Sequence, residues 1–135
     1  MNPRVAREFV TERAASRCEY CRAPQIVTGA NYHIEHIAPR ALGGNDDPGN
    51  YALACITCNG HKSAHITGID PETRDDVPLF DPRRDRWTQH FRFVSKSLEL
   101  RGLTPKGRAT VARLQMNEPR QIEARDLWVE LEIYP

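Results

Sequence analysis

The sequence predicts a small α+β protein whose central part runs strand, loop, strand, helix. Three observations support this prediction. The chain has 135 residues, about the length of one domain. Short strand-like and helix-like segments alternate along it, with no internal repeat. Two C-x-x-C pairs, separated by 33 residues, enclose the central strands.

The elements of the first region follow from periodicity and from turn residues. Residues 3–16 space their apolar side chains along one face and predict a helix. Residues 32–37 and 51–54 predict two strands joined by a loop rich in Gly, Asn and Asp. A helix is expected to open in the second cysteine pair and to run to about Ile66.

The second region begins with an acidic stretch. Residues 68–82 carry five acids against one arginine, a net charge of −4, and predict an exposed loop. The stretches 91–94 and 97–100 predict a hairpin. Two helices are expected after it, over residues 106–116 and 118–131, the second with Asn117 as N-cap and Pro119 in its first turn.

We divide the chain into residues 1–67, the core with its N-terminal helix, and residues 68–135, an extension. The extension is expected to pack on the same domain, because neither part alone would bury much surface. From Arg83 to Arg113 nine basic residues stand against two acids, a net charge of +7. Such a segment suits phosphate neutralisation, and a solvated surface would explain it equally well.

Composition excludes several classes of protein. Lys plus Arg is 19 and Asp plus Glu is 18, so the net charge is +1, and 39% of the residues are hydrophobic. These values favour neither a disordered chain nor a coiled coil. The longest apolar run, Tyr51–Ile56, is far below the roughly 20 residues that span a bilayer. The first residues carry no signal peptide. We therefore expect a soluble cytoplasmic protein without a membrane partner.

The four cysteines predict a structural zinc site. Each C-x-x-C pair can direct two thiolates at one ion, and two pairs complete a tetrahedral site. A redox pair or unrelated buried thiols would explain a single C-x-x-C, but not two in one short chain. Because thiolate fills all four positions, the ion is expected to be structural. The ligands are Cys18, Cys21, Cys55 and Cys58.

Oxygen and nitrogen donors between the cysteine pairs suit a second chemistry. Glu35 and His36 are adjacent on a strand that ends before Pro39, which lets both approach one cleft. Asn59 and Lys62 are three residues apart on a helix and share a face. Carboxylate and amide oxygens suit Mg²⁺ or Mn²⁺, unlike the soft thiolates. A neutral imidazole could deprotonate water, and a lysine could hold a phosphate oxygen.

The order of these motifs resembles the HNH endonuclease family of the ββα-metal superfamily, in its zinc-knuckle branch. The resemblance covers about residues 18–65 and combines several motifs: C-x-x-C, Glu35-His36-Ile37, a Gly-Gly loop, Asn50, and C-x-x-C-Asn59-x-x-Lys62. It implies a small ββα-metal (HNH) core stapled by a four-cysteine zinc site. The C-terminal hairpin and helices lie outside it, as an extension.

The resemblance also implies a role for each matched residue. His36 matches the general base that takes a proton from the attacking water. Glu35 stands where the family has an acidic metal ligand, usually Asp, and its extra methylene could shift the ion. Asn50 matches the asparagine that pins the long loop and helps orient the base. Asn59 fills a position where many members have a histidine ligand, and Lys62 is expected to contact phosphate.

The implied function is a metal-dependent endonuclease that hydrolyses DNA, most simply double-stranded DNA. The catalytic ion would be Mg²⁺ or Mn²⁺, and the products would carry 5′-phosphate and 3′-hydroxyl ends. Three further candidates are weaker. His61 is a substitute ligand for Asn59. His33 is expected outside the metal ligands, with contact to the metal or to DNA as the alternative. Arg40 is either a phosphate contact or a plain surface residue.

Two other functions remain open at this point. One is a zinc-stabilised nucleic-acid-binding module without catalytic activity, and the other is a protein-interaction scaffold. The complete set of matched residues favours the nuclease, because a degenerate site should have lost at least one of them. The basic segment argues mildly against the scaffold. The small size is consistent with a homodimer or with a partner protein.

Overall fold

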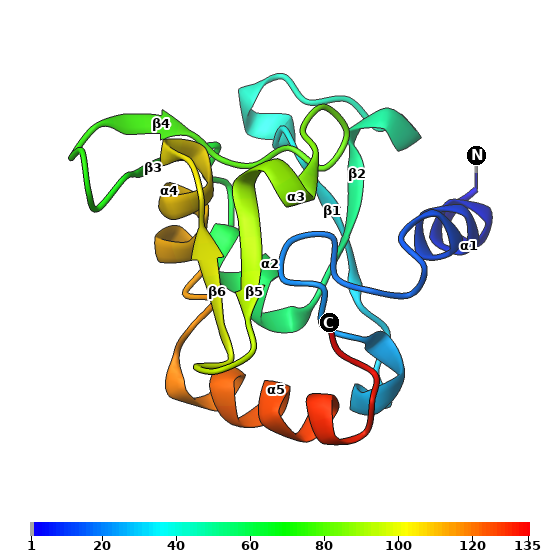
Figure 1. Ribbon diagram of the computed structural model, residues 1–135. Helices are drawn as coiled ribbons and strands as arrows, with labels where there is room; N and C mark the ends of the chain where they lie inside the picture. Colours follow the sequence, from blue (N-terminus) through cyan, green and yellow to red (C-terminus); the bar gives the residue numbers. More distant parts are fainter. Residues whose placement is uncertain (1) are drawn as a thin grey trace.

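Three two-stranded antiparallel sheets and five α-helices alternate along residues 2–135, which the computed structural model describes (Figure 1). The mixed architecture confirms the predicted α+β class. Three short 3₁₀ turns complete the first region, at Gln25–Thr28, Arg40–Leu42 and Pro48–Asn50. Within residues 2–135, no helix combines the length and the apolar character needed to cross a membrane.

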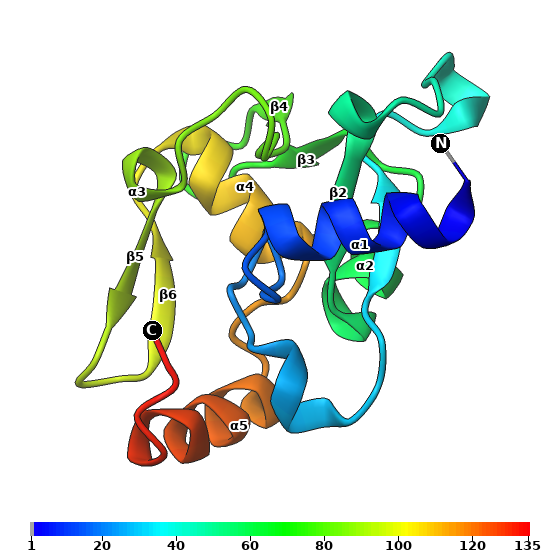
Figure 2. The ribbon, with the colours of Figure 1, turned by 90° about the vertical axis from the view of Figure 1, so that its right-hand side faces the viewer.

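The first helix, α1 (Pro3–Arg13), is shorter than predicted. It starts as expected, with Pro at its first position and with Asn2 Oδ1 accepting a hydrogen bond from the Val5 N–H at 2.9 Å. It ends early because Ala15 and Ser16 both take positive φ angles, which turn the chain toward the first cysteine pair. Figure 2 shows α1 crossing over the second strand of the central hairpin.

The central unit is the predicted strand, loop, strand and helix. Strand β1 (His33–His36) pairs with β2 (Tyr51–Ala54), so that His36 lies opposite Tyr51 and Glu35 opposite Ala52. Helix α2 (Ile56–Lys62) follows β2 directly, with Cys55 as its N-cap. It ends at Lys62, four residues before the predicted end, because Ser63 has a φ of 49° and breaks the helical backbone.

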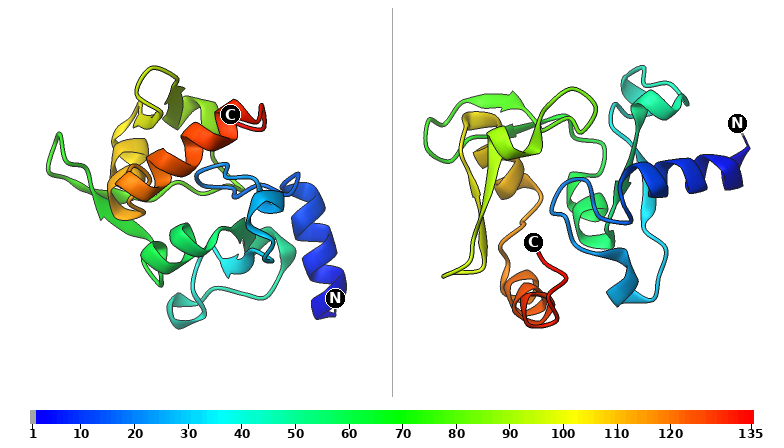
Figure 3. Two further views of the ribbon diagram at one scale, coloured as in Figure 1. Left: turned by 90° about the horizontal axis from the view of Figure 1, so that it is seen from below. Right: turned by 45° about the vertical axis from the view of Figure 1, so that its right-hand side comes forward.

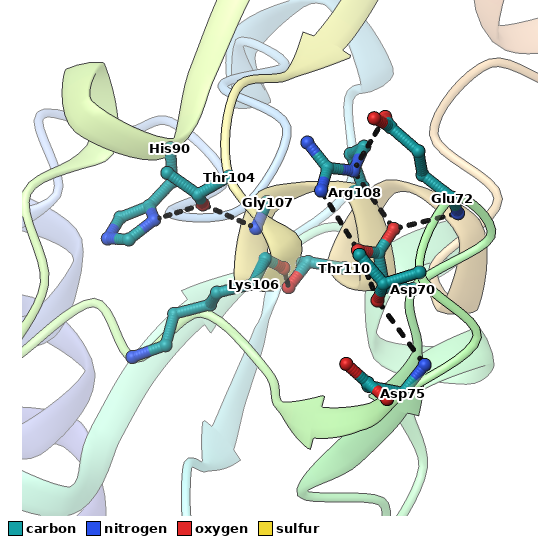
Figure 4. A network of polar contacts seen from close by, with 10 residues as sticks. Asp70, Glu72, Asp75, His90, Thr104, Lys106, Gly107, Arg108 and Thr110 are labelled. Carbon is teal, nitrogen blue, oxygen red and sulfur yellow. Dashed lines mark hydrogen bonds and ion pairs between the residues drawn. The ribbon is translucent and has the colours of Figure 1, made fainter.

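Residues 68–82 correct the sequence prediction, because much of this acidic stretch is folded. Strands β3 (Thr67–Ile69) and β4 (Asp76–Pro78) form a hairpin that packs on helix α4 (Pro105–Arg113). Asp70, predicted to be exposed, is completely buried. Its carboxylate receives two hydrogen bonds from Arg108, both at 2.9 Å (Figure 4). An ion pair to a distant helix therefore orders a segment whose composition resembles a loop.

The rest of the extension follows the prediction more closely. A short helix α3 (Trp87–His90) precedes the hairpin of β5 (Phe91–Val94) and β6 (Glu99–Gly102). Helix α4 begins at its N-cap Thr104, whose Oγ1 also lies 2.7 Å from His90 Nδ1 (Figure 4). It ends at Arg113, three residues before the prediction.

The predicted N-cap of the last helix is wrong. Helix α5 (Pro119–Glu130) has Glu118 as its N-cap, and the Asn117 side chain instead bonds to the backbone of β6. Asn117 Oδ1 accepts from the Leu100 N–H, and Asn117 Nδ2 donates to the Leu100 carbonyl, both at 2.8 Å. A side chain that satisfies both backbone groups of a strand residue cannot also cap a helix.

The two regions share one core around the first cysteine pair. Trp87 Nε1 donates to the Tyr20 carbonyl at 2.8 Å, and the Tyr134 hydroxyl donates to the Cys21 carbonyl at 2.8 Å. Phe80 packs edge-on against both Tyr20 and Phe91. Figure 3 shows that α5 and the loop between β1 and β2 lie at opposite ends of the molecule. The central hairpin and α2 are thus held by packing against the extension, while the loop of residues 37–50 extends away from this shared core.

Candidate functional site

The four cysteines form a closed cluster that fits zinc. All four are buried, and their Sγ atoms lie within 4.8 Å of one another. The Sγ atoms of Cys21 and Cys55 are 3.8 Å apart. A tetrahedral zinc ion with Zn–S bonds of about 2.3 Å places its sulfur ligands about 3.8 Å apart. Within residues 2–135 this is the one group of three or more Cys, His, Asp or Glu side chains close enough to share an ion.

The electrostatics of the cluster also favour a cation. Hydrogen bonds with the neighbouring Cys18 thiol, together with burial, raise the pKa of Cys21 and of Cys58. Four buried thiols so close together are held as thiolates only by a positive charge at their centre. The cluster joins the turn before β1 to the start of α2, because Cys55 follows β2 and caps that helix.

His36 lies at the exposed end of β1, against a carboxylate and an arginine. Its Nε2 atom is 2.8 Å from Asp46 Oδ1, and one quarter of its side chain is exposed. The same oxygen receives hydrogen bonds from Arg40, with Nε at 2.9 Å and Nη2 at 2.8 Å. The imidazole packs edge-on against Tyr51 on the neighbouring strand. The hydrogen bonds from His36 and Arg40 lower the pKa of the Asp46 carboxyl below its ordinary value.

The loop after β1 is folded so that Asp46 reaches His36. Asn50 Oδ1 accepts from the Ala38 N–H at 2.9 Å, while its Nδ2 donates to the carbonyls of Ala38 and Asn45 at 3.0 and 2.9 Å. Gly43 has a φ of 86°, and a Cβ on Gly44 would lie 1.7 Å from the Ala38 carbonyl oxygen. The Gly-Gly pair therefore permits a tight return of the chain that other residues would block.

Glu35 points to the opposite side of β1, into the protein. It is 6% exposed, and its Oε1 atom accepts a hydrogen bond from the buried Tyr20 hydroxyl. Its Oε2 atom is 3.1 Å from Nζ of Lys62, which is 1% exposed and also donates to the Ile37 carbonyl at 3.1 Å. Burial raises the pKa of the Glu35 carboxyl, although Lys62 and Tyr20 oppose the shift. Three elements meet at this buried pair: the first cysteine pair, β1 and α2.

These contacts decide how well the predicted ligands fit a second metal ion. Both carboxylate oxygens of Glu35 already have partners, and the Lys62 ammonium lies where a cation bound to Oε2 would lie. Asn59 is half-buried on α2, and its side-chain amide has no hydrogen-bond partner among the described residues. Hard oxygen donors are present, but Glu35 is closed to a cation in this arrangement. The predicted pair of ligands therefore does not fit a divalent ion as it stands.

The remaining candidates lie apart from one another. His33 is exposed at the far end of β1 from His36. His61 Nδ1 is 3.0 Å from the Leu114 carbonyl, so this imidazole contacts the extension. Arg40 stays on the loop after β1, in contact with Asp46. Sequence analysis missed Tyr20 and Asp46, whose contacts with Glu35 and His36 span 15 and 10 positions of the chain.

A cleft of about 770 Å³ separates the loop after β1 from residues 78–85 of the extension. Asn50 and Lys62 line it on the side of the central unit. Its opposite wall carries charges of both signs, from Arg83, Arg84, Lys106, Asp81 and Asp85. Lys106 is paired with Asp85 at 2.9 Å and Arg83 with Glu19, while the Arg84 side chain is 87% exposed. An extended polar ligand could enter between the central unit and the extension.

Comparison with known proteins identifies the central unit. Residues 18–65 match the family model described as HNH endonuclease. The matched segment begins at Cys18, contains both cysteine pairs and the hairpin of β1 and β2, and includes all of α2. Searches of the curated proteins and of the solved structures found no match.

Proposed function

We propose that this protein, whose residues 18–65 form an HNH endonuclease domain, hydrolyses phosphodiester bonds of DNA. The family match supports the nuclease class. The single observation that carries the proposal is the position of His36. It stands at the open end of a hairpin whose second strand leads into the cysteine cluster, with one ring nitrogen in contact with Asp46 and a quarter of its side chain exposed.

His36 would act as the general base. A neutral imidazole accepts one proton, and the ring nitrogen not bonded to Asp46 is the one that remains for a water molecule. That water forms a bond from its oxygen to phosphorus as its proton passes to His36. The bond from phosphorus to the leaving 3′ oxygen breaks, and that oxygen takes a proton from solvent water, which gives 5′-phosphate and 3′-hydroxyl ends.

Mg²⁺ or Mn²⁺ stays a prediction for the catalytic ion, with Glu35 and Asn59 as its predicted ligands. Glu35 does not fit this role in the present arrangement, because the Lys62 ammonium lies against its Oε2 atom. Lys62 lines the cleft but is almost fully buried and paired with Glu35, so its contact with a phosphate stays a prediction. Asn50 would fix the loop that carries the partner of His36.

The charge of the extension supports a polyanionic partner. Four of the nine basic residues between 83 and 113 have an acidic partner: Arg83, Arg84, Lys106 and Arg108. The other five make no ion pair within the described part of the chain. Among them, Arg92 and Arg101 are exposed and directly opposite each other on β5 and β6. Like charges in that arrangement repel, and a phosphate backbone would relieve the repulsion.

One observation favours the alternative, a nucleic-acid-binding module without catalytic activity. The Lys62 ammonium forms a buried ion pair with the Glu35 carboxylate. A divalent ion could bind Glu35 only after this pair is broken, which costs free energy, and a protein that keeps the pair would bind DNA without cleaving it. The two functions differ in what they do to DNA in the presence of a divalent ion.

A cleavage assay on supercoiled plasmid with Mg²⁺ or Mn²⁺ distinguishes them. We expect the wild type to nick or linearise plasmid and His36→Ala to lose at least about 100-fold in rate, because a general base contributes that much. His65→Ala is the matched control, since this histidine is exposed beyond the end of α2. Zinc content and circular dichroism confirm that each variant is folded. Binding without cleavage by the wild type would support the alternative, and equal cleavage by both variants would remove His36 as the base.

A further inference from the structure

Asp46 is an exposed carboxylate in the loop between β1 and β2. We propose that Asp46 is a positioning residue for His36, which it holds in the tautomer that carries its proton on Nε2. The inference rests on the proposed function of His36 as the base. The geometry behind it is the contact of 2.8 Å between His36 Nε2 and Asp46 Oδ1.

A carboxylate accepts hydrogen bonds and cannot donate them, so the ring nitrogen that contacts it must carry the proton. A neutral imidazole has one protonated nitrogen, and Nδ1 is therefore left with its lone pair. When water gives its proton to Nδ1, the positive charge of the ring lies next to Asp46. The Nε2 proton stays where it is, and the ion pair stabilises the charged ring as the water attacks.

Arg40 fixes the carboxylate before any substrate arrives. Two of its nitrogens contact the same Oδ1 atom that contacts His36, at 2.9 and 2.8 Å. The Asp46 side chain is therefore held from both sides of one oxygen. The Gly43-Gly44 turn and the Asn50 hydrogen bonds bring it into that position.

Stability does not explain the arrangement. The side chains of Asp46 and Arg40 are 59% and 69% exposed. An ion pair so open to water contributes little to folding, since solvent screens it and both side chains lose entropy. Gly43, Gly44 and Asn50 nevertheless shape the loop so that the Asp46 carboxylate contacts the His36 imidazole. Positioning of His36 by Asp46 explains why the loop has this conformation.

Kinetics of cleavage test the inference. We expect Asp46→Ala and Asp46→Asn to lower kcat by about 10- to 100-fold with KM within about twofold, because the proton acceptor is misplaced while DNA binding is not. Asp46→Glu should recover part of the loss. Asp126→Ala is the control, an exposed aspartate on α5 at the other end of the molecule. A change confined to KM, or rates equal to those of the control, would overturn the inference.

A second readout does not depend on cleavage. Nitrogen-15 NMR of the imidazoles at neutral pH distinguishes the two tautomers by their ring-nitrogen shifts. We expect the proton of His36 on Nε2 in the wild type and a mixture of tautomers in Asp46→Ala. A proton on Nδ1 in the wild type, or identical spectra for both proteins, would overturn the inference. If the wild type cleaved no DNA, the proposed function would fall, and the spectra alone would still decide whether Asp46 orients His36.

Discussion

The two regions of the chain each contain an aspartate–arginine pair, and the pairs differ in burial. In the extension, Asp70 and Arg108 meet through two hydrogen bonds of 2.9 Å, with the Asp70 side chain completely buried. In the HNH domain, Asp46 and Arg40 meet at 2.8 Å with more than half of each side chain exposed. The chemistry is the same, but water reaches only one of the two carboxylates.

The other partners of the two carboxylates differ as well. Asp70 also accepts from the Glu72 N–H (Figure 4) and from the Thr73 hydroxyl, so its remaining contacts lie within the turn between β3 and β4. The hydrogen bonds from Arg108 hold the pKa of the Asp70 carboxyl well below its ordinary range. Asp46 has His36 as its second partner beside Arg40, and an imidazole can exchange a proton near neutral pH.

The two regions obtain their stability from different interactions. The extension depends on a buried ion pair between a hairpin and α4. The HNH domain depends on its cysteine cluster and on the buried contacts of Glu35, which leaves the exposed pair free to serve a reacting group. Each of these supports can be removed separately by a chelator or by a single substitution.

Removal of zinc should have the largest effect. A strong chelator, or Cys55→Ser, should abolish the cooperative unfolding transition of the HNH domain, because the binding energy of a structural zinc ion is folding energy. Bound zinc, measured by elemental analysis, should be one ion per chain. Thermal unfolding followed by circular dichroism is the measurement. A metal-free protein with an unchanged Tm would show that the cysteine cluster is not a zinc site.

Disruption of the buried pair below β1 should be the next largest effect. Lys62→Met should lower Tm by about 10 °C or more, since it leaves the Glu35 carboxylate buried without its cation. The double variant Glu35→Gln with Lys62→Met should recover much of that loss, because no buried charge remains. Differential scanning calorimetry of the two single variants and the double variant, as a double-mutant cycle, measures the coupling between Glu35 and Lys62. Additive losses would mean that the two side chains are not coupled.

Sequence reasoning located the HNH domain because its signals are local. The spacing of the cysteine pairs, the strand predicted to end before Pro39 and the turn residues of the loop are each contained in a few positions. These short-range patterns were sufficient for β1, β2 and the start of α2. Helix ends were less accurate, because single residues such as Ser63 stop the helix through backbone conformation that side-chain pattern does not encode.

Contacts between distant residues could not be predicted in this way. The acidic stretch after α2 resembles a loop until Arg108, 38 positions later, neutralises Asp70. Asn117 has the sequence context of an N-cap, but its side-chain amide is hydrogen-bonded to the backbone of β6. Asp46 carries no local signal at all, since nothing in a run of Gly, Asn and Asp marks which carboxylate will meet His36. The sequence therefore predicts the residues that match the family pattern, but their contact partners can be identified only from the three-dimensional structure.

Loss of the buried pair in the extension should have an intermediate effect that depends on pH. Asp70→Asn should lower Tm by about 8 °C at pH 7, because it removes the charge that Arg108 contacts inside the protein. The folded protein holds the Asp70 pKa below its unfolded value of about 3.9, so the stabilisation is present above that pH and is lost as the pH falls. The difference in Tm between wild type and variant should therefore shrink between about pH 5 and pH 3. A difference that stayed constant over this interval would mean that ionisation of Asp70 does not stabilise the fold.

The exposed pair should give the smallest effect on stability, and that is the sharpest contrast with Asp70. Asp46→Ala and Arg40→Ala should each leave Tm within about 2 °C of the wild type, because water already screens the charges they remove. Salt should likewise change their Tm no more than that of the wild type.

The same two variants distinguish two roles for Arg40. A fall in kcat smaller than that of Asp46→Ala would show that Arg40 acts through the carboxylate. A rise in KM alone would assign Arg40 to the DNA phosphate. A Tm lowered as far as in Asp70→Asn would show instead that the loop pair is structural, and the distinction between the two regions would fail.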